Sequence, residues 1–416
     1  MSDRDFWQDF FEQAIAPVHP SVCVPSALPE PSQYKAIKII AVGKAAAAMA
    51  LAVEQSWPKQ QFSGLAVCPY GHQIECSRFE MLEAAHPVPD QNSALAAQKA
   101  LSMAAEVKPG ELLLVLLSGG ASSLLCAPAG GMTLKQKQQL TGDLLRVGAP
   151  IEEINLVRSH YSEIKAGGLL AQIPDGAEVI TLAISDVVGD DPAKIGSGPT
   201  IWSFTPSNMV RNILEKYNIP APEISVPQRM EPTVPGNYET IVNADAMLAT
   251  AADWLTRKGY EVVDLGPAEQ GEARDVAMEH VRGVEAYLKD SPDNKTAFLS
   301  GGELTVTVSG SGKGGPNQEY LLAVMSKLAP GKFAGFAADT DGCDGIGGAA
   351  GAYFDPNIHA RALGSYDCAA SLDSNNSYLF FSKLGALFKV NPTLTNVNDL
   401  RVILYQPGKF GSLTDL

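Results

Sequence analysis

Clusters of cysteine are missing from this sequence. Its six cysteines lie far apart, without a CxxC pair and without histidines at the spacing of a zinc site. Scattered thiols in a chain of 416 residues are typical of a reducing compartment, so we expect a soluble, cytoplasmic protein. The first residues show no basic segment followed by an apolar one, and the most apolar run, 112–117, has the length of a strand. Neither a secretory signal nor a membrane span is therefore expected.

Positive charge is also scarce. Lys and Arg total 31 against 46 Asp and Glu, which gives a formal charge of −15. Such a field repels polyphosphate backbones and excludes nucleic acid as an expected partner. If the substrates are small anions, a few local cations must bind them, and these cations are the residues to find. The remaining composition, 45% hydrophobic and 19% charged, is that of a globular protein, and the length suits two domains.

The chain is organised around residues 185–200, SDVVGDDPAKIGSGPT. An apolar stretch, 178–184, precedes them and predicts a strand of a parallel sheet that helices cover on both faces. Asp186 and Asp190 follow the strand end among small residues, and the terminal Gly-Ser-Gly-Pro-Thr lets the backbone approach a ligand closely. Carboxylates beside an anion-binding turn are what a metal–nucleotide site requires, although an acidic surface loop has the same composition.

Two further strand–turn–helix units carry candidate site residues. Residues 36–42 predict a strand, after which Lys44 opens an alanine-rich helix, where a cation is unfavourable unless an anion binds there. The alternative for Lys44 is a solvated surface lysine. The strand 112–117 ends in Ser118-Gly-Gly-Ala-Ser-Ser, a turn suited to presenting N–H groups to phosphate. The chain contains neither a Walker loop nor a Gly-x-Ser-x-Gly elbow.

Residues 155–168 concentrate cations in this acidic chain. Arg158 and Lys165 stand seven residues apart, which places them on one face of a helix if that helix is unbroken. Together they suit the binding of a carboxylate or a phosphate, and arginine can bind either in a bidentate way. Ordinary surface charge on a helix is the alternative interpretation.

The second half of the chain follows a proline-rich segment, 219–238, which we interpret as the link between two domains. Residues 296–300 and 304–309 predict two strands on either side of Gly301-Gly-Glu303. A glycine loop, 310–315, then opens a helix, and Lys313 in this loop suits phosphate. The loop satisfies GxGxxG, but no acidic residue follows at the distance that a dinucleotide fold requires. Strand 333–338 leads into Asp339-Thr-Asp-Gly, which lacks the spacing of a calcium loop.

Taken together, these motifs resemble the type II glycerate 2-kinases, whose members were also once labelled hydroxypyruvate reductases. The resemblance implies an α/β protein of two domains: a Rossmann-like three-layer α/β/α parallel-sheet domain at 1–235 and a smaller α/β MOFRL domain at 236–416. It also implies an active site in the interdomain cleft. The motifs that carry it are Val42-Gly-Lys-Ala-Ala, Ser118-Gly-Gly-Ala-Ser, Asn155-Leu-Val-Arg, Lys165-Ala-Gly-Gly, Ser185-Asp-Val-Val-Gly-Asp-Asp, Ser197-Gly-Pro-Thr, Ser300-Gly-Gly-Glu, Asp339-Thr-Asp-Gly and Thr395-Asn-Val-Asn-Asp.

The family implies ATP- and Mg²⁺-dependent phosphorylation of D-glycerate to 2-phosphoglycerate, and the sequence leaves open whether subunits pair as a homodimer. By this resemblance Lys44 is the catalytic lysine, and Asp186 and Asp190 are acidic residues of the site. We expect these two acids to hold Mg²⁺, and one of them to accept the hydroxyl proton. The expected substrate-binding residues are Arg158, Lys165, Ser118, Gly119, Gly120 and Ser122, and the expected nucleotide-binding residues are Glu303, Gly312, Lys313, Gly314, Gly315, Asn317, Asp339 and Asp341.

One position departs from the family in a way that bears on activity. The family's glycine loop normally reads Gly-Gly-Arg-Asn-Gln-Glu, and Pro316 here replaces an arginine thought to act on phosphate. Proline carries no charge and no N–H group, so it supplies nothing to an anion. Two alternatives therefore stay open beside the kinase: an NAD(P)-dependent hydroxypyruvate reductase, and an altered or inactive homologue that binds anions.

Overall fold

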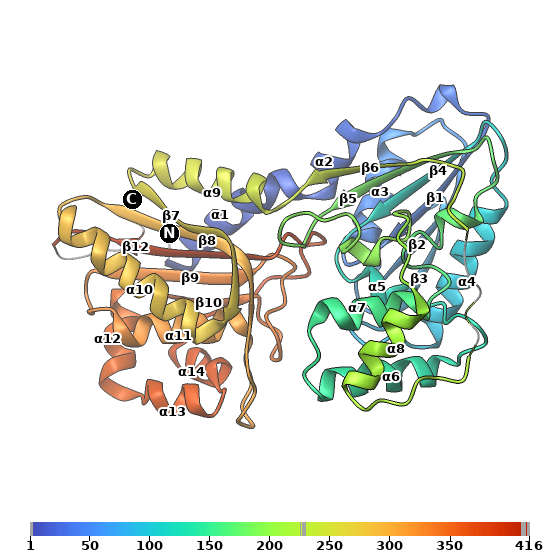
Figure 1. Cartoon of the computed structure of the whole chain (residues 1–416). Helices are drawn as coiled ribbons and strands as arrows, with labels where there is room; N and C mark the ends of the chain where they lie inside the picture. The colour runs from blue at the N-terminus through green and yellow to red at the C-terminus, as the bar shows by residue number, and fades with distance from the viewer. Residues whose placement is uncertain (1–2, 225, 227–229, 409–412, 414–416) are drawn as a thin grey trace. The chain divides into compact units, whose positions relative to one another are not determined.

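The computed structural model describes residues 3–224, 226, 230–408 and 413, and it divides the chain into two compact units (Figure 1). One unit comprises Pro20–Val242, and we call it the 20–242 unit. The other comprises Met1–His19 together with Asn243–Leu416, and we call it the 243–416 unit. Each unit is built on its own six-stranded sheet, which confirms the predicted two-domain α/β architecture.

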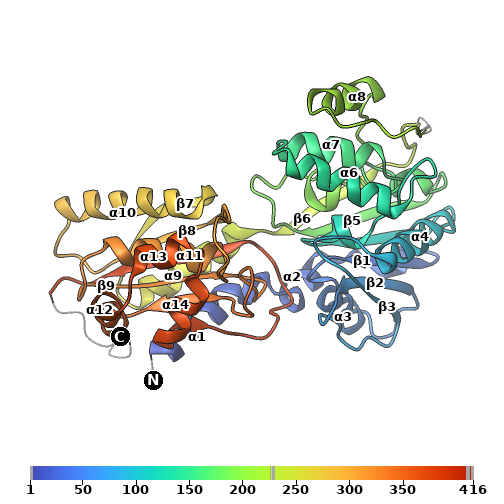
Figure 2. The same ribbon diagram turned by 90° about the horizontal axis from the view of Figure 1, so that it is seen from below.

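The 20–242 unit contains a six-stranded, entirely parallel sheet in the order β3-β2-β1-β4-β5-β6. All six residues of β4 are buried, because helices cover both faces of the sheet (Figure 2). This burial is why the strand reads as a continuous apolar run. The strands are β1 (Ile37–Val42), β2 (Ser63–Pro69), β3 (Phe79–Ala84), β4 (Leu112–Leu117), β5 (Glu178–Ile184) and β6 (Gly236–Val242).

The strand order of this sheet reverses between β1 and β4. From β1 the chain steps outward to β2 and β3, and from β4 it steps to β5 and β6 on the other side. Val42 pairs with Leu117, and Leu117 pairs with Ala183, so the turns after β1, β4 and β5 leave the same edge of the sheet. In open α/β sheets, ligands bind outside the carboxyl ends of the strands at such a switch point.

Helices of the 20–242 unit form two groups. α3 packs on β1 and β2, while α4 packs on the Ile40 and Val42 side of the sheet. The helices α6, α7 and α8 lie together with a core of their own (Figures 1 and 2). The bounds are α2 (Pro20–Ala27), α3 (Ala46–Ser56), α4 (Gln91–Ala105), α5 (Ala121–Leu124), α6 (Leu134–Arg146), α7 (Ile151–His160) and α8 (Ser207–Lys216).

The 243–416 unit contains a mixed sheet in the order β11-β10-β9-β12-β8-β7. Only β7 and β8 pair in parallel among its described ladders, and the other four ladders are antiparallel. The strands are β7 (Glu261–Glu272), β8 (Thr296–Thr305), β9 (Phe333–Asp339), β10 (Gly351–Phe354), β11 (Leu387–Phe388) and β12 (Asp399–Tyr405).

The N-terminal helix α1 belongs to this second sheet. Its apolar face packs aromatic rings onto the sheet, and Trp7 stacks on Phe336 with ring centroids 5.3 Å apart. On the same side lies α9, whose Trp254 contacts Phe6. The helices of the unit are α1 (Asp3–Ile15), α9 (Ala244–Arg257), α10 (Ala273–Asp290), α11 (Pro316–Lys327), α12 (Pro356–Ser365), α13 (Cys368–Asp373) and α14 (Ser377–Leu384).

The structure corrects three expectations about organisation. The expected boundary between 235 and 236 falls instead between Val242 and Asn243, because residues 236–242 form β6 of the first sheet, and residues 1–19 join the second unit. The proline-rich segment, whose residues 225 and 227–229 lie outside the described part, therefore precedes an edge strand rather than linking the domains. Residues 296–305 form one strand, β8, rather than two.

No helix in the described part of the chain is both long enough and apolar enough to cross a bilayer.

Candidate active site

Lys44 and the turn after β4 are locked together by backbone contacts. The Lys44 N–H donates to Gly119 O at 2.8 Å, and the Ala45 N–H donates to Ser118 Oγ at 3.0 Å. Gly43 adopts φ 129°, and a Cβ at this position would lie 2.5 Å from the carbonyl oxygen of Ser118. Only glycine permits that approach. The structure thus brings Lys44, Ser118 and Gly119 together at the switch point.

Gly120 lies against the side chains of His86 and Lys44, at the carboxyl edge of the first sheet. It has φ 83°, and a Cβ added to it would be 3.0 Å from His86 Cδ2 and 3.5 Å from Lys44 Cγ. His86 follows β3, two residues beyond its last residue, Ala84. It was not among the expected site residues. Its sequence signal is a histidine just past a strand of a parallel sheet, but 79–84 alternates too weakly in polarity to be recognised as a strand.

Ser122 joins the two expected substrate-binding cations. Arg158 Nη2 donates to Ser122 Oγ at 2.8 Å, and Lys165 Nζ donates to the same oxygen at 2.5 Å. The two cations would share one helical face only in an unbroken helix, and the helix is broken: α7 ends at His160 and Lys165 lies in the turns that follow. Tertiary folding rather than helical spacing brings their charged ends together.

Lys165 is one of the most buried ionisable groups of the chain, with a side chain that is 1% exposed. Burial lowers its pKa well below the ordinary value of a lysine, and the charges of Arg158 and Lys137 lower it further. Burial also lowers the pKa of Arg158. Three cations in a chain of net charge −15 are therefore gathered in one place. Their mutual repulsion would be relieved by a bound anion.

Lys137 is a further residue that the sequence analysis did not single out. Its ammonium donates to the carbonyls of Arg158 at 3.0 Å and of Tyr161 at 2.5 Å, at the C-terminal end of α7. Cations are favourable at that end of a helix. The signal was present in the sequence, because Lys137 stands on the same face of α6 as the buried Leu140 and Leu144.

The loop after β5 carries three acids whose charges act on Tyr238. Burial raises the pKa of Tyr238, and the charges of Asp190, Asp186 and Asp191 raise it further. Asp186 and Asp190 are half-buried, and Asp190 adopts φ 51° in the turn that follows Gly189. The two expected metal ligands thus lie in one loop at the same sheet edge as Lys44.

The donor set of this loop fits Mg²⁺ that arrives with a nucleotide. Within the described part of the chain, no three His, Cys, Asp or Glu side chains are grouped so as to hold a metal by themselves. Mg²⁺ in kinases takes only one or two protein carboxylates and completes its shell with water and substrate phosphates. Asp186 and Asp190 supply oxygen ligands of that kind.

The glycine loop 310–315 packs closely against the segment between α13 and α14. A Cβ at Gly310 would meet the Ser374 carbonyl at 2.2 Å, and one at Gly312 would meet the Asn375 carbonyl at 2.5 Å. The Gly312 N–H donates to Ser374 O at 3.0 Å. These contacts explain the glycines without a ligand. Lys313 is exposed, and phosphate binding by Gly312, Lys313, Gly314 and Gly315 stays a prediction.

The first amides of α11 are engaged by a buried carboxylate. Asp344 accepts hydrogen bonds from the N–H groups of Asn317 at 3.0 Å and of Gln318 at 2.9 Å. Burial raises the pKa of Asp344 to about 7, while these two N–H groups act in the opposite direction. Pro316 occupies the first position of the helix, where the missing N–H costs nothing. An anion at this helix end would compete with Asp344 for the same donors.

Three expected nucleotide-binding residues remain, and they lie in β8, at the end of β9 and in the turn after β9. Glu303 lies inside β8 opposite Gln270 and is exposed. Asp339 accepts from the Asp341 N–H at 2.9 Å, and Asp341 accepts from the Cys343 N–H at 2.7 Å. The two aspartates therefore shape the turn after β9. Their role toward a nucleotide stays a prediction.

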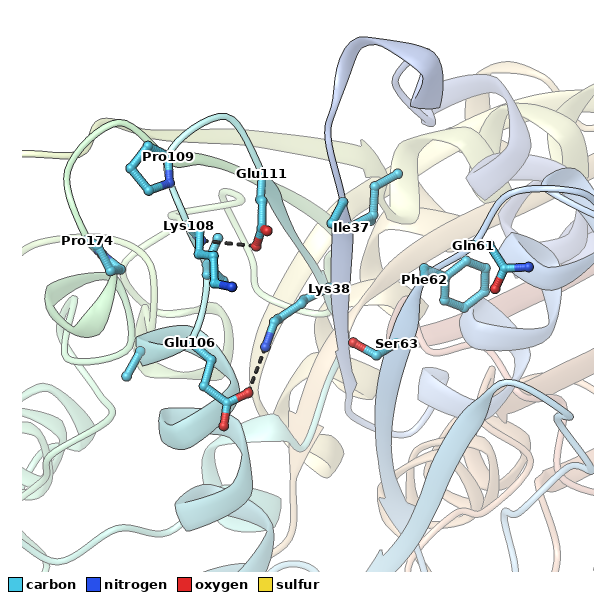
Figure 3. Close-up of a pocket in the computed structure, with 13 residues that line it drawn as sticks. Ile37, Lys38, Gln61, Phe62, Ser63, Glu106, Lys108, Pro109, Glu111 and Pro174 are labelled. Atoms are coloured by element: carbon cyan, nitrogen blue, oxygen red, sulfur yellow. Dashed lines mark hydrogen bonds and ion pairs between the residues drawn. The ribbon is translucent and has the colours of Figure 1, made fainter.

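A hollow in the 20–242 unit lies at the amino edge of its sheet (Figure 3). Lys44, Ser118 and Asp186 follow strands at the opposite, carboxyl edge of the same sheet. It is lined by the beginnings of β1 and β2 and by the segment before β4, and Lys38 Nζ contacts Glu106 Oε2 there at 2.7 Å. None of the expected site residues lines it. We therefore place the candidate site at the carboxyl edge, where Lys44, Arg158 and Lys165 are held, and not in this hollow.

Comparison with known proteins matches both units to described families. Residues 6–231 match the family described as Domain of unknown function (DUF4147), and residues 296–399 match the MOFRL family. A protein of Agrobacterium vitis named "Putative hydroxypyruvate reductase" is 40% identical over 422 residues, which cover 97% of this chain and 95% of that protein.

Other relatives carry kinase names. "D-glycerate 2-kinase" of Thermotoga maritima is 36% identical over 406 residues, covering 94% of this chain and 96% of that protein. "Glycerate 2-kinase" of Pyrococcus horikoshii is 34% identical over 390 residues, covering 88% and 87%. The crystal structure of glycerate kinase from Thermotoga maritima aligns with a TM-score of 0.85 at 34% identity, covering 97% of this chain and 99% of that one. The chain therefore belongs to the type II glycerate 2-kinase family, in which a DUF4147 domain is followed by a MOFRL domain.

Proposed function

We propose that this protein is a glycerate kinase that transfers the terminal phosphoryl group of ATP to the 2-hydroxyl of D-glycerate and releases 2-phosphoglycerate. The observation that carries the proposal is the gathering of Lys44, Ser122, Arg158 and Lys165 at the carboxyl edge of one parallel sheet. Relatives that match most of the chain are named glycerate kinases, and they supply the reaction class.

Phosphoryl transfer requires alignment and charge neutralisation more than covalent chemistry by the protein. Lys44, held at the switch point by its bond to Gly119, would stabilise the negative charge of the transferring group. Arg158 would neutralise the carboxylate of glycerate, with Lys165 adding charge from behind Ser122. Asp186 or Asp190 would accept the proton of the attacking hydroxyl.

Asp186 and Asp190 would also hold Mg²⁺, which when bound neutralises charge on the phosphate oxygens. The nucleotide itself would be bound by Glu303, Gly312, Lys313, Gly314, Gly315, Asn317, Asp339 and Asp341, as the sequence predicts. A cytoplasmic location is a further expectation from the scattered cysteines, and whether subunits pair as a homodimer stays open.

A hydroxypyruvate reductase is the second candidate, since relatives from Agrobacterium vitis carry that name. Its sequence support was the GxGxxG pattern at 310–315. Gly310 and Gly312 pack closely against residues 374–376, and Gly315 packs against Asp344, so these glycines have a reason that involves no dinucleotide. The kinase is therefore the better supported function.

The proposal is tested by incubating the purified protein with D-glycerate, ATP and Mg²⁺ and identifying the product by phosphorus NMR. We expect 2-phosphoglycerate, and we expect no oxidation of NADH with hydroxypyruvate. Lys44→Ala should lower kcat by about 100-fold or more, as loss of a transition-state charge contact does. The matched control is Lys99→Ala, which removes an exposed lysine paired with Glu80. Product formation with NADH but not with ATP would reject the kinase.

A further inference from the structure

The hydrogen bonds of Ser122 leave its hydroxyl with one direction in which to donate. A serine hydroxyl has one proton and two acceptor lone pairs. Arg158 Nη2 at 2.8 Å and Lys165 Nζ at 2.5 Å both donate to Ser122 Oγ, which fills both lone pairs. The third contact of this oxygen is Ser197 Oγ at 2.9 Å. Although the distance alone permits either donor, the two cations make Ser122 the donor and Ser197 the acceptor.

The proton of Ser197 is consequently directed out of this cluster. Its oxygen accepts from Ser122, and Lys165 Nζ, another donor, lies 3.5 Å from it. Neither neighbour is placed to take the Ser197 proton, because the Ser122 hydroxyl already accepts two hydrogen bonds and Lys165 Nζ makes its short contacts to Ser122 O at 2.6 Å and Ser122 Oγ at 2.5 Å. The Ser197 hydroxyl is therefore a donor whose polarity is increased by the chain of donors behind it.

The backbone holds Ser197 in an uncommon conformation. Its φ is 63°, between Gly196 at 59° and Gly198 at 56°. The Ala166 N–H donates to Ser197 O at 3.0 Å, and the Gly167 N–H donates to Gly198 O at 2.7 Å, so two segments fix the position. Glycine would meet this φ at lower cost than serine. Residues held in such regions are concentrated at sites of function, where the strain is offset elsewhere.

Lys165 is too deeply placed to be the group that a substrate meets. Its side chain is 1% exposed, whereas Ser197 is 8% exposed and Ser122 is half-buried. Lys165 therefore acts on a ligand outside the cluster by polarising the hydroxyls of Ser122 and Ser197. This differs from the expectation that Lys165 itself holds the carboxylate of glycerate.

We propose that Ser197 is a substrate-binding residue that donates its hydroxyl proton to an anionic oxygen of a bound substrate. Lys165 is a positioning residue, which together with Arg158 orients Ser122 and, through it, Ser197. The inference rests on the proposed kinase function and deepens it by naming a donor that the sequence analysis did not assign. The anionic oxygen belongs either to the carboxylate of glycerate or to a phosphate of ATP, and the experiment distinguishes these sources.

The test replaces Ser197 in two ways and measures KM for D-glycerate and for ATP separately. Ser197→Gly removes the hydroxyl and suits the backbone, while Ser197→Ala removes the hydroxyl and keeps the Cβ. A hydrogen bond to a charged group contributes enough that its loss raises KM by about ten- to 100-fold. A rise in the KM for glycerate identifies the carboxylate, and a rise in the KM for ATP identifies a phosphate. Both constants within about twofold of the wild-type values overturn the proposal, even if kcat falls.

Two controls keep the result specific. Asn218→Gly relieves a similar positive φ, 54°, in the turn after α8, and it should leave both KM values unchanged. In a double-mutant cycle, Lys165→Met should raise the same KM as Ser197→Gly, and the combined variant should lose clearly less than the product of the two effects. If the effects of the two substitutions on KM multiply fully in the combined variant, Lys165 does not position Ser197.

Failure of the kinase proposal is distinguishable from failure of this inference. If the wild-type protein does not phosphorylate D-glycerate, calorimetry with D-glycerate and with ATP still reports the dissociation constants of wild type and Ser197→Gly. A larger dissociation constant for either ligand in Ser197→Gly supports the donor role, and unchanged dissociation constants for both ligands reject it.

Discussion

Arg158 and Lys165 donate to the same oxygen, Ser122 Oγ, at 2.8 and 2.5 Å, although the helix that carries Arg158 ends before Lys165 is reached. Two cations that share one neutral acceptor are held close together at a cost in Coulomb energy. The chain sustains this arrangement within a buried environment while its net charge is −15. An anionic ligand is the partner that would make the arrangement favourable.

The charge of Lys165 should make the stability of the protein depend on pH in the alkaline range. Its folded pKa lies below the ordinary 10.5, so between the two values the unfolded chain binds more protons and stability rises with pH. Lys165→Met lacks this titration. We expect the variant to be at least as stable as wild type near pH 7, with an advantage that shrinks toward pH 10, as measured by urea unfolding.

The charged and titratable groups whose charges shift the pKa of Lys165 are Arg158, Lys137 and Cys126, and all three stay in the variant. The difference between the two unfolding curves therefore isolates Lys165. The exposed Lys99→Met serves as the control and should show no such trend. A Lys165→Met variant that is less stable than wild type at pH 7, with a deficit that does not change up to pH 10, would contradict the direction of the shift.

Gly120→Ala should damage activity more than stability. The new methyl group would press on His86 and Lys44, 3.0 and 3.5 Å from its carbon, and displace the proposed catalytic lysine. Gly131 is a matched control, because its φ of 80° resembles the 83° of Gly120 and nothing lies within 4 Å of its Cβ position. Both variants should lose roughly 1 kcal/mol of stability from the positive φ. Only Gly120→Ala should lose about tenfold or more in kcat, and equal activities would separate Gly120 from the site.

Much of the fold was predictable because burial leaves a strong signal in the sequence. Residues 112–117 are apolar throughout and residues 178–184 are mostly apolar, and both are strands with the predicted bounds. The boundary between the domains was not predictable in this way. Strand β6 is an edge strand with a mixed burial pattern, so its membership in the first sheet depends on pairing with β5 and not on its own composition.

The candidate site was predictable where glycines and charges stand at strand ends. Lys44 and the turn after β4 were found by this rule, and the structure holds them in contact. His86 was not found, because its position depends on a weakly patterned strand. Ser197 was found only as part of a glycine turn, because the bonds that fix its position come from residues 166 and 167. Such contacts between distant segments cannot be read from local sequence spacing.

Restoring the family arginine should have a modest effect on catalysis. Pro316 stands at the first position of α11, and the next two N–H groups are bound by Asp344, so Pro316→Arg disturbs no hydrogen bond. The cations Lys44, Arg158 and Lys165 are all present without it. We expect kcat/KM for ATP to change by less than about tenfold, with glycerate turnover measurable in the wild type. Turnover that appears only in Pro316→Arg would instead show that this chain has lost its activity by that substitution.

His280 should make the protein less stable in mild acid. The side chain is buried, and Nδ1 contacts Tyr320 Oη at 2.8 Å. Burial, and next the charge of Arg401, lower its pKa to about 4, so the 3.8 Å contact with Glu269 is not an ion pair at neutral pH. The unfolded histidine titrates near 6.5, so between these values the unfolded chain binds the extra proton. Stability is complete above pH 6.5 and falls as the pH falls toward 4.

The size of this effect follows from a shift of about 2.5 pKa units, which corresponds to roughly 3 kcal/mol at its full extent. His280→Asn keeps a polar partner for Tyr320 but does not titrate. Urea unfolding of wild type and variant at a series of pH values between 7 and 4 should show the wild type losing stability relative to the variant as the pH falls. Carboxylates such as Asp344 titrate in the same range, but they are common to both proteins and cancel in the difference. Parallel curves would mean that His280 has the same pKa in the folded and in the unfolded chain, and would contradict the effect of burial.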